Sequence, residues 1–344
     1  MKTVYNEKHV LHDPKQNRAE TGMVEYFEKP SRAETILKYV RDRKLGPVLA
    51  PESFGQETIR KVHKPRYVDF LEQAHARWLK AGMEDTLFFP SVSAMQHPAA
   101  REPRAIFGQL GLYMADCYVA FTKTTWEAVF ASACTALTAQ KIVAGGERAA
   151  FALCRPPGHH ATAATAAGYC FINNAAVAAQ AFIDQGAKRV AILDVDYHHG
   201  NGTQDIFYER ADVLTVSIHA DPADDYPFYM GHGDEKGAGK GEGFNVNYPL
   251  PLGTNYKTWA AALDDGTARI RKYGPDALVV SLGVDTFGGD PISQFKLQSP
   301  DYTDMGARIA GLKLPTLFVM EGGYAVDEIG LNVTNVLAGF EAGK

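Results

Sequence analysis

The second half of the chain alternates between short apolar runs and longer segments with helical periodicity. Runs rich in β-branched residues predict strands at 149–154, 189–195, 213–219, 277–283 and 315–321. Apolar residues three and four positions apart predict helices at 126–144, 173–185, 256–272, 302–312 and 326–340. Because strands that alternate with helices form βαβ units, this order predicts a parallel sheet.

Several of the predicted strands are apolar at every position instead of alternating with polar residues. The runs VAILDV and LVVSLGV are examples. Strands of this kind are typical of sheets that are covered by helices on both faces. The pattern therefore predicts a three-layer α/β/α fold with a central, mostly parallel sheet. No linker rich in serine, glycine or proline divides the chain and no repeat is visible, so we expect one domain over 1–344.

Two stretches, 84–107 and 231–243, lack either periodicity and are predicted to be long loops. Long loops in compact domains are usually functional or mobile. The second contains Lys240, but no serine or threonine follows it, which excludes a Walker-type phosphate loop. On the first, Phe88, Phe89 and Met95 would be exposed. Exposed apolar clusters tend to mark association surfaces, so this loop is a candidate subunit contact.

Composition and charge exclude several classes of protein. Charged residues make up 22% and hydrophobic residues 46% of the chain, as in ordinary globular proteins. The net charge is −5 and no run of lysine or arginine occurs, so neither nucleic acid nor an anionic membrane is expected as a partner. The chain starts without an apolar signal segment and contains no long apolar run, from which we expect a cytoplasmic protein. The four cysteines lack metal-site or disulfide spacing and are expected to be reduced thiols.

Polar clusters follow directly after four of the predicted strands: RPPGHHA, DVDYHHGNG, GVDTFGGDP and EGGY. Ligands of open parallel sheets bind at the carboxyl ends of the strands. Asp194, Asp196 and His198 are two residues apart, so their side chains share one face while the chain is extended. Asp285, after another strand, can add a carboxylate. Histidine and carboxylate ligands suit zinc, and also Fe²⁺, Co²⁺ or Mn²⁺. The alternative, that these residues are only strand-end caps, does not account for four such strand ends.

Five motifs, RPPGHHA, GYCFINNAA, DVDYHHGNGTQDIFY, SLGVDTFGGDP and MEGGY, resemble the zinc-dependent histone deacetylase superfamily. The resemblance is strongest to its bacterial acetylpolyamine amidohydrolase branch. It covers about 149–335, while 1–148 resembles the family more loosely, through KVHKPRYVDFLE and TWEA. It implies an arginase-like α/β fold and a zinc ion held by Asp196, His198 and Asp285.

The resemblance also implies a catalytic pair, His159 and His160, and an electrophile, Tyr324. In the family pattern Asp194 stands behind His159, and Asn201 stands behind His160. A carboxylate partner favours an imidazolium and a neutral amide does not. We therefore expect His159 to act electrostatically, His160 to act as general base and then acid, and the Tyr324 hydroxyl to stabilise the oxyanion.

The same resemblance implies further sites. The walls of the substrate tunnel would be Tyr169 and Tyr226, with Ile292 nearby, and Gly168 could present its carbonyl to the substrate amide. Two structural potassium sites are implied as well; they would involve Asp194, Asp196, His198, Ser217 and Ile218, and Phe207, Arg210, Val213 and Phe244. His199 is expected to support the metal ligands from behind or to pack in the core, because period-two geometry turns it away from His198.

The expected substrate is a small acetylated amine such as acetylputrescine or acetylcadaverine. In the resembling branch, an insertion at 84–107 pairs two subunits and narrows the tunnel mouth, which implies a homodimer. Acidic residues at the mouth are sparse here, since GLYMADCYVAF contains only Asp116. The alternative substrate is acetyl-lysine in a protein. A metal-free acetyl-binding protein would have lost a ligand or Tyr324, and a ureohydrolase would need ligands for two adjacent metals.

Overall fold

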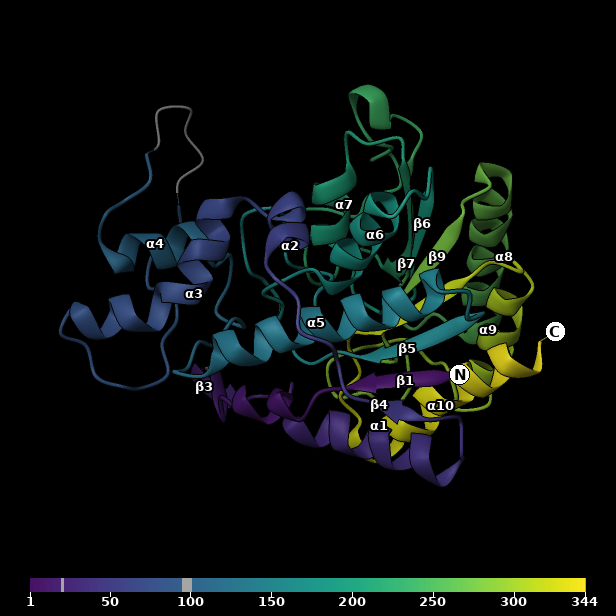
Figure 1. Cartoon of the computed structure of the whole chain (residues 1–344), viewed down its shortest axis with the longest axis horizontal. Coiled ribbons are helices and arrows are strands. Elements are labelled where there is room, and N and C mark those ends of the chain that lie inside the picture. Colours follow the sequence, from purple (N-terminus) through teal and green to yellow (C-terminus); the bar gives the residue numbers. More distant parts are fainter. Residues whose placement is uncertain (20–21, 95–100, 344) are drawn as a thin grey trace.

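A computed structural model describes residues 1–19, 22–94 and 101–343. Its centre is an eight-stranded sheet with the order β4-β1-β5-β10-β9-β6-β7-β8, in which all pairings are parallel (Figure 1). The strands are β1 (Lys2–Tyr5), β4 (Val48–Leu49), β5 (Ala149–Leu153), β6 (Val190–Asp194), β7 (Val213–Ala220), β8 (Asn245–Leu250), β9 (Ala277–Leu282) and β10 (Thr316–Met320). The predicted parallel α/β fold is confirmed.

Helices cover both faces of this sheet. They are α1 (Pro30–Asp42), α2 (Glu57–Val62), α3 (Pro65–Lys80), α4 (Ile106–Tyr113), α5 (Thr125–Ala144), α6 (Asn174–Asp184), α7 (Asn201–Phe207), α8 (Tyr256–Tyr273), α9 (Asp301–Ala310) and α10 (Val326–Ala342), with 3₁₀ turns η1 (Glu7–Leu11) and η2 (Gly239–Gly241). A separate antiparallel hairpin is formed by β2 (Gln16–Ala19) and β3 (Gly22–Glu25). No helix of the described ranges is long and apolar enough to cross a membrane.

The core is divided by the sheet into two apolar layers. Successive strand residues point to opposite faces, so Ile192 packs with α5 and α6 whereas Ala191 and Leu193 pack with α8, α9 and α10. The strands are apolar throughout because both faces are buried, as the sequence predicted. α1 and α10 lie together on the second face (Figure 1).

Capping residues set the limits of several helices. Asn173 accepts a hydrogen bond from Ala176 N and begins α6, and Asn255 does the same for α8 through Thr258 N. α1 and α3 each have proline in the first turn, where its missing N–H is not needed. Gly274 ends α8 in the left-handed conformation, with φ of 63°.

The predicted elements from residue 126 onward agree with the structure to within two residues at either end. The elements before residue 125 were not predicted, and neither were β8 and α7. β8 has the sequence NVNYPL and lies at the sheet edge, where mixed polar residues are tolerated, so it lacks the apolar signature of the central strands.

The segment 84–107 differs from the predicted exposed loop. Phe88 is only 2% exposed and stacks on Trp78 of α3, with ring centroids 4.6 Å apart, while its backbone bridges to Phe121. Phe89 is partly buried. The expectation that both rings are exposed was wrong, because this subunit itself supplies the aromatic surface that covers them. Met95 lies outside the described residues, and association through this segment stays a prediction.

Candidate active site

Four neighbouring strands, β5, β10, β9 and β6, deliver the predicted site residues to one edge of the sheet. The loop after β5 carries the His159–His160 pair, and the loop after β6 carries Asp196 and His198. Asp285 follows β9 and Tyr324 follows β10. Because all four strands run parallel, their carboxyl ends meet, and residues up to 165 positions apart in the sequence are brought together.

Asp196, His198 and Asp285 form a buried cluster with converging donor atoms. Each can offer one donor atom such that all three atoms lie within 4.8 Å of one another. His198 Nδ1 is 3.4 Å from Asp196 Oδ1 and 3.1 Å from Asp285 Oδ2. The backbone fixes the carboxylates, since His198 N donates to Asp196 Oδ1 and Tyr197 N donates to Asp285 Oδ1. This arrangement places one imidazole and two carboxylates around a single point.

The charge of this cluster fits a bound cation. Asp196 and Asp285 are both 0% exposed. Burial and the neighbouring negative charge of Asp196 raise the pKa of Asp285 to about 7. Buried carboxylates are costly unless they are paired with positive charge or coordinate a metal, and here only the imidazoles of His198 and His159 lie beside them. A nitrogen and two carboxylate oxygens are a ligand set that divalent ions such as zinc accept.

Gly283 allows the backbone after β9 to approach this cluster. A Cβ atom at this position would lie 1.9 Å from Asp196 Oδ2, inside any possible contact distance. Asp196 cannot move away without losing the hydrogen bond that Gly322 N donates to the same oxygen, at 2.8 Å. The glycine is therefore required for the position of the Asp196 carboxylate.

We expect Gly283→Ala to weaken divalent-metal binding by about 10- to 100-fold, the usual cost of disturbing the support of a metal ligand. Titration of the metal-free protein with Zn²⁺ against a competing chelator measures this affinity. Gly233→Ala is the matched control, because its Cβ would meet only Pro249, at 3.8 Å. Equal affinities of the two variants would show that the Gly283 backbone approach is not required to place the Asp196 carboxylate for metal binding.

The two histidines have different partners. His159 Nδ1 is 3.0 Å from Asp194 Oδ2, and His160 Nδ1 is 2.7 Å from Asn201 Oδ1. Burial alone would lower the pKa of His159, but Asp196 and Asp194 together raise it to about 10. Burial and the positive charges of its histidine neighbours hold the pKa of His160 well below its ordinary value. These shifts favour an imidazolium at His159 and a neutral imidazole at His160.

Tyr324 is held by the turn that precedes it. Its backbone N–H donates to Asp290 Oδ2 at 2.7 Å. Arg32 of α1 donates to the carbonyl oxygens of Glu321 and Gly323, at 2.6 and 2.5 Å, and its guanidinium lies 4.8 Å from the centre of the tyrosine ring. Burial holds the pKa of the Tyr324 hydroxyl well above its ordinary value, so the group stays protonated and can donate a hydrogen bond.

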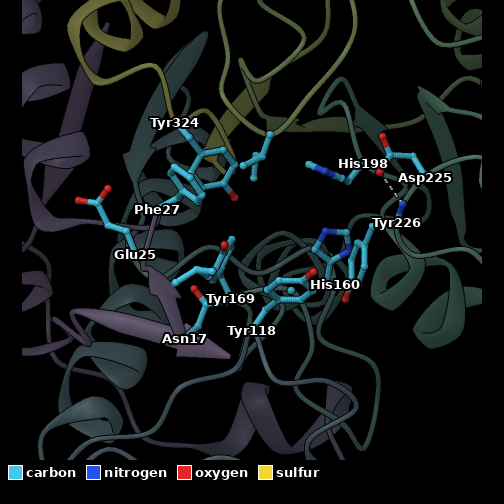
Figure 2. A pocket seen from close by; sticks show the side chains of 13 residues that line it. Asn17, Glu25, Phe27, Tyr118, His160, Tyr169, His198, Asp225, Tyr226 and Tyr324 are labelled. Carbon is cyan, nitrogen blue, oxygen red and sulfur yellow. Dashed lines mark hydrogen bonds between the residues drawn. The ribbon is translucent and has the colours of Figure 1, made fainter. Parts of the chain in front are cut away.

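A cavity of about 380 Å³ leads from the surface to this cluster. Its walls are largely aromatic, and His160, His198 and Tyr324 line it (Figure 2). The remaining lining residues are Asn17, Val24, Glu25, Phe27, Tyr118, Gly168, Tyr169, Asp225, Tyr226 and Ile292. The cavity has the size of a small-molecule site, with a few polar groups at its inner end.

Comparison with known proteins agrees with this geometry. The model of the histone deacetylase domain matches residues 26–340. The chain belongs to the histone deacetylase domain family. It is 54% identical to acetylpolyamine amidohydrolase 1 of Pseudomonas aeruginosa and 50% identical to the acetylpolyamine amidohydrolase of Mycoplana ramosa, over 99% and 98% of this chain and 99% of each relative. The crystal structure of an acetylpolyamine aminohydrolase from Burkholderia pseudomallei superposes with a TM-score of 0.94 at 39% identity, covering 100% of this chain and 99% of that one.

In this histone deacetylase family member, one carboxylate connects two walls of the cavity. Asp116 Oδ2 accepts hydrogen bonds from the Tyr226 hydroxyl at 2.7 Å and from Gly168 N at 3.0 Å, and its Oδ1 accepts from Tyr118 N at 2.9 Å. Asp116 was the one acidic residue that the sequence offered at the tunnel mouth. Its carboxylate is hydrogen-bonded by residues of the cavity wall. Its hydrogen bonds orient Tyr226 and the Gly168 backbone.

The other predicted residues are placed as follows. Tyr169, Tyr226, Gly168 and Ile292 all line the cavity. The Gly168 carbonyl oxygen accepts a hydrogen bond from the Cys170 thiol, with 3.3 Å between the oxygen and Sγ. His199 is 1% exposed, and its ring centre lies 4.4 Å from that of His219, away from the metal-ligand cluster. Its position agrees with the packing role that we expected.

The predicted potassium-site residues lie in two places beside the central strands. Asp194 is paired with Ser217 in the register of β6 and β7, next to Ile218, Asp196 and His198. In the second group the carbonyl of Phe207 accepts from Arg210 N, and the carbonyl of Phe244 accepts from Thr215 N, near Val213. Potassium binding stays a prediction at both.

A second buried group of potential ligands, His159, Cys170 and Glu321, is already used by the fold. Glu321 Oε2 accepts from the N–H groups of Gly158 and His159, at 2.6 and 3.1 Å. Burial holds the pKa of the Cys170 thiol well above its ordinary value, and a protonated thiol is a poor ligand. We therefore assign this group to support of the histidine pair.

No pattern in the sequence indicated that the hairpin β2–β3 contributes to the cavity. Asn17, Val24 and Glu25 come from it, and Phe27 follows it directly. The stretch QNRAETGMVE has neither alternation nor a turn motif that would indicate a strand pair. Only the three-dimensional fold brings it to the mouth.

Proposed function

We propose that this protein hydrolyses the amide bond of small N-acetylated diamines and polyamines, with a divalent metal held by Asp196, His198 and Asp285. The observation that carries the proposal is the convergence of this ligand set with a neutral histidine and a tyrosine hydroxyl at the inner end of one aromatic cavity. Full-length identities of 50% and above to acetylpolyamine amidohydrolases support the reaction and the substrate class.

Zinc is the proposed metal, because the three donors suit a site that keeps coordination positions open for water and substrate. Fe²⁺, Co²⁺ and Mn²⁺ accept the same ligands and are alternatives. When bound, the ion lowers the pKa of water to about 7 and polarises an amide carbonyl, which makes a weak nucleophile and a poor electrophile reactive.

His160 is the proposed proton carrier. It lines the cavity, and its imidazole is unprotonated there, so a ring nitrogen is available to accept a proton from water. The Asn201 side chain holds the ring through Nδ1, which directs Nε2 to the cavity side. The proton that His160 takes up can then be donated to the departing amine nitrogen, so one residue serves both halves of the reaction.

His159 and Tyr324 provide the complementary charges. The His159 imidazolium, paired with Asp194, contributes a fixed positive charge next to the site. The Tyr324 hydroxyl donates a hydrogen bond to the oxygen on which negative charge develops. Tyr169 and Tyr226 form apolar walls along which a methylene chain of the substrate can lie, with water excluded from the amide.

Acetate release from three substrates tests the proposal. We expect acetylcadaverine or acetylputrescine to be hydrolysed with a higher kcat/KM than an acetyl-lysine peptide, and acetylated folded histones to be poor substrates. The aromatic walls admit a flexible chain but leave little room for a protein surface. Faster turnover of folded histones than of acetylcadaverine would instead assign this protein to the protein deacetylases.

A further inference from the structure

Tyr324 follows two consecutive glycines that its place beside the metal-ligand cluster requires. A Cβ atom at Gly322 would lie 2.6 Å from Asp285 Oδ2, and Gly323 has a φ of 121°, which residues with a side chain rarely adopt. Glycine leaves the backbone more conformational freedom than any other residue. The position of the Tyr324 hydroxyl therefore depends on contacts from outside this turn.

Asp290 provides such a contact on the C-terminal side of the turn. Its Oδ2 accepts hydrogen bonds from Tyr324 N at 2.7 Å and from Ala325 N at 3.2 Å. These N–H groups lie at the start of α10, whose N-cap residue Ala325 makes no capping hydrogen bond with a side chain of its own. The dipole of the helix also favours a carboxylate at this end. Asp290 therefore fixes the backbone of the tyrosine itself, whereas Arg32 holds the carbonyl groups before it.

The Asp290 carboxylate is itself held in place. Pro291 follows it and disfavours a helical backbone at Asp290. Asp290 N donates to the carbonyl of Phe287 at 3.0 Å, and Asp290 Oδ1 accepts from Ile292 N at 3.1 Å. Asp290 is 8% exposed, and the described residues that line the cavity include Ile292 but not Asp290. An effect of Asp290 on the reaction must therefore pass through the groups that it binds.

We propose that Asp290 is a positioning residue for the reaction. By binding the N–H groups of Tyr324 and Ala325, it holds the Tyr324 hydroxyl where negative charge develops on the amide oxygen. The loop that carries Asp290 also carries the metal ligand Asp285, so one segment, 283–293, places the hydroxyl relative to the metal site. This inference rests on the proposed function, in which Tyr324 stabilises the oxyanion.

The expected effect is on turnover and not on substrate binding. Loss of one oxyanion donor costs about 100- to 1,000-fold in kcat, and a displacement of about 1 Å can cost about 100-fold. We therefore expect Asp290→Ala to lower kcat for acetylcadaverine about 10- to 100-fold. The KM should stay close to that of the wild type, because the aromatic walls of the cavity are unchanged.

A double-mutant cycle with Tyr324→Phe tests whether Asp290 acts through the hydroxyl. Phenylalanine lacks the hydroxyl and retains the backbone N–H that Asp290 binds. Asp290→Ala should lower kcat in the wild type but should leave the already slow Tyr324→Phe enzyme unchanged. A residue that only stabilised the fold would impair both enzymes alike. Release of isotopically labelled acetate measures the low rates.

Asp276→Ala is the matched control. Asp276 Oδ2 also accepts hydrogen bonds from two consecutive N–H groups, those of Lys188 and Arg189, at 2.7 and 3.0 Å. Asp276 precedes β9 and Asp290 follows it, so the two carboxylates lie at opposite ends of this strand. Asp276→Ala should lower the melting temperature and leave kcat unchanged.

Two further variants separate positioning from folding. Asp290→Asn retains an oxygen that can accept from Tyr324 N, so its kcat should be closer to that of the wild type than to that of Asp290→Ala. Asp290→Ser covers the case in which Asp290→Ala does not fold. Its hydroxyl is one bond shorter and cannot reach both N–H groups, so it should show the same loss of kcat and the same dependence on the Tyr324 hydroxyl. Metal content should equal that of the wild type in every variant.

Three results would overturn this inference or its basis. An equal loss of kcat from Asp290→Ala in the wild type and in Tyr324→Phe would show that Asp290 does not act through the hydroxyl. Loss of metal from Asp290→Ala would assign Asp290 to the support of Asp285 instead. A wild type that hydrolyses an acetyl-lysine peptide but not acetylcadaverine would overturn the proposed substrate class, and the same cycle measured with the peptide would then decide the role of Asp290.

Discussion

Replacing Asp196, His198 or Asp285 by alanine should abolish hydrolysis of acetylcadaverine, because each change removes one of three metal ligands. The three donor atoms lie within 4.8 Å of one another and no other described carboxylate or imidazole completes this cluster. Two remaining ligands would leave a weak site. The rate should therefore fall to the detection limit together with the metal content, not to an intermediate value.

The measurement is metal content per protein after dialysis, made alongside the turnover number for each purified variant. Asp327→Ala is the control, since Asp327 is exposed in the first turn of α10. Circular dichroism and a melting curve would separate loss of metal from loss of fold. Full metal occupancy in all three ligand variants would refute the assigned metal site.

The sequence was sufficient for the five central strands of the sheet and for the inner end of the cavity because the same physical constraint produces both. Central parallel strands such as VAILD and ALVVSL are buried on both faces and so are apolar throughout. The polar residues that directly follow these strands are therefore easy to recognise in the sequence. In a parallel sheet these residues share one edge, so the meeting of Asp196 with Asp285 follows from topology.

The outer part of the cavity was beyond sequence reasoning, because it is built from segments with no local pattern. The hairpin that carries Asn17 has no hydrophobic periodicity from which its position could be predicted, so only the complete fold shows where it packs. The same holds for Asp116, whose four hydrogen-bonding neighbours include Tyr226, 110 residues away. Hydrophobicity was also misleading for Phe88, because the covering surface comes from α3 and Phe121.

The sequence also left the support of Tyr324 unseen. Arg32 reaches the turn before Tyr324 from a helix nearly 300 residues earlier in the chain. A buried ion pair with Glu28, at 2.6 Å, holds Arg32 in place. Neither residue lies in the motifs that indicated the chemistry, since a buried arginine among helix-forming residues looks like an exposed one until its neighbours are known.

His160→Ala should reduce kcat/KM for acetylcadaverine more than His159→Ala does. His160 lines the cavity, whereas His159 does not, so only His160 can exchange a proton with water or with the amine. General acid–base catalysis by one side chain contributes about 100- to 10,000-fold. The loss of His159 removes a positive charge near the reacting groups but leaves His160 to carry the proton. His159→Ala should therefore retain more activity than His160→Ala.

Metal content must be measured in both variants, because His159 Nε2 lies 3.8 Å from Asp196 Oδ1 and its removal alters the charge around the metal ligands. Glutamine variants at both positions provide a second comparison. Glutamine retains a hydrogen-bonding side chain but cannot carry a proton at neutral pH, so His160→Gln should remain as impaired as His160→Ala. If His159→Ala or His159→Gln, with full metal content, were the slower enzyme, the roles of the two histidines would be exchanged. The raised pKa of His159 beside Asp194 would then have to be compatible with proton transfer, which the buried, carboxylate-bound ring does not favour.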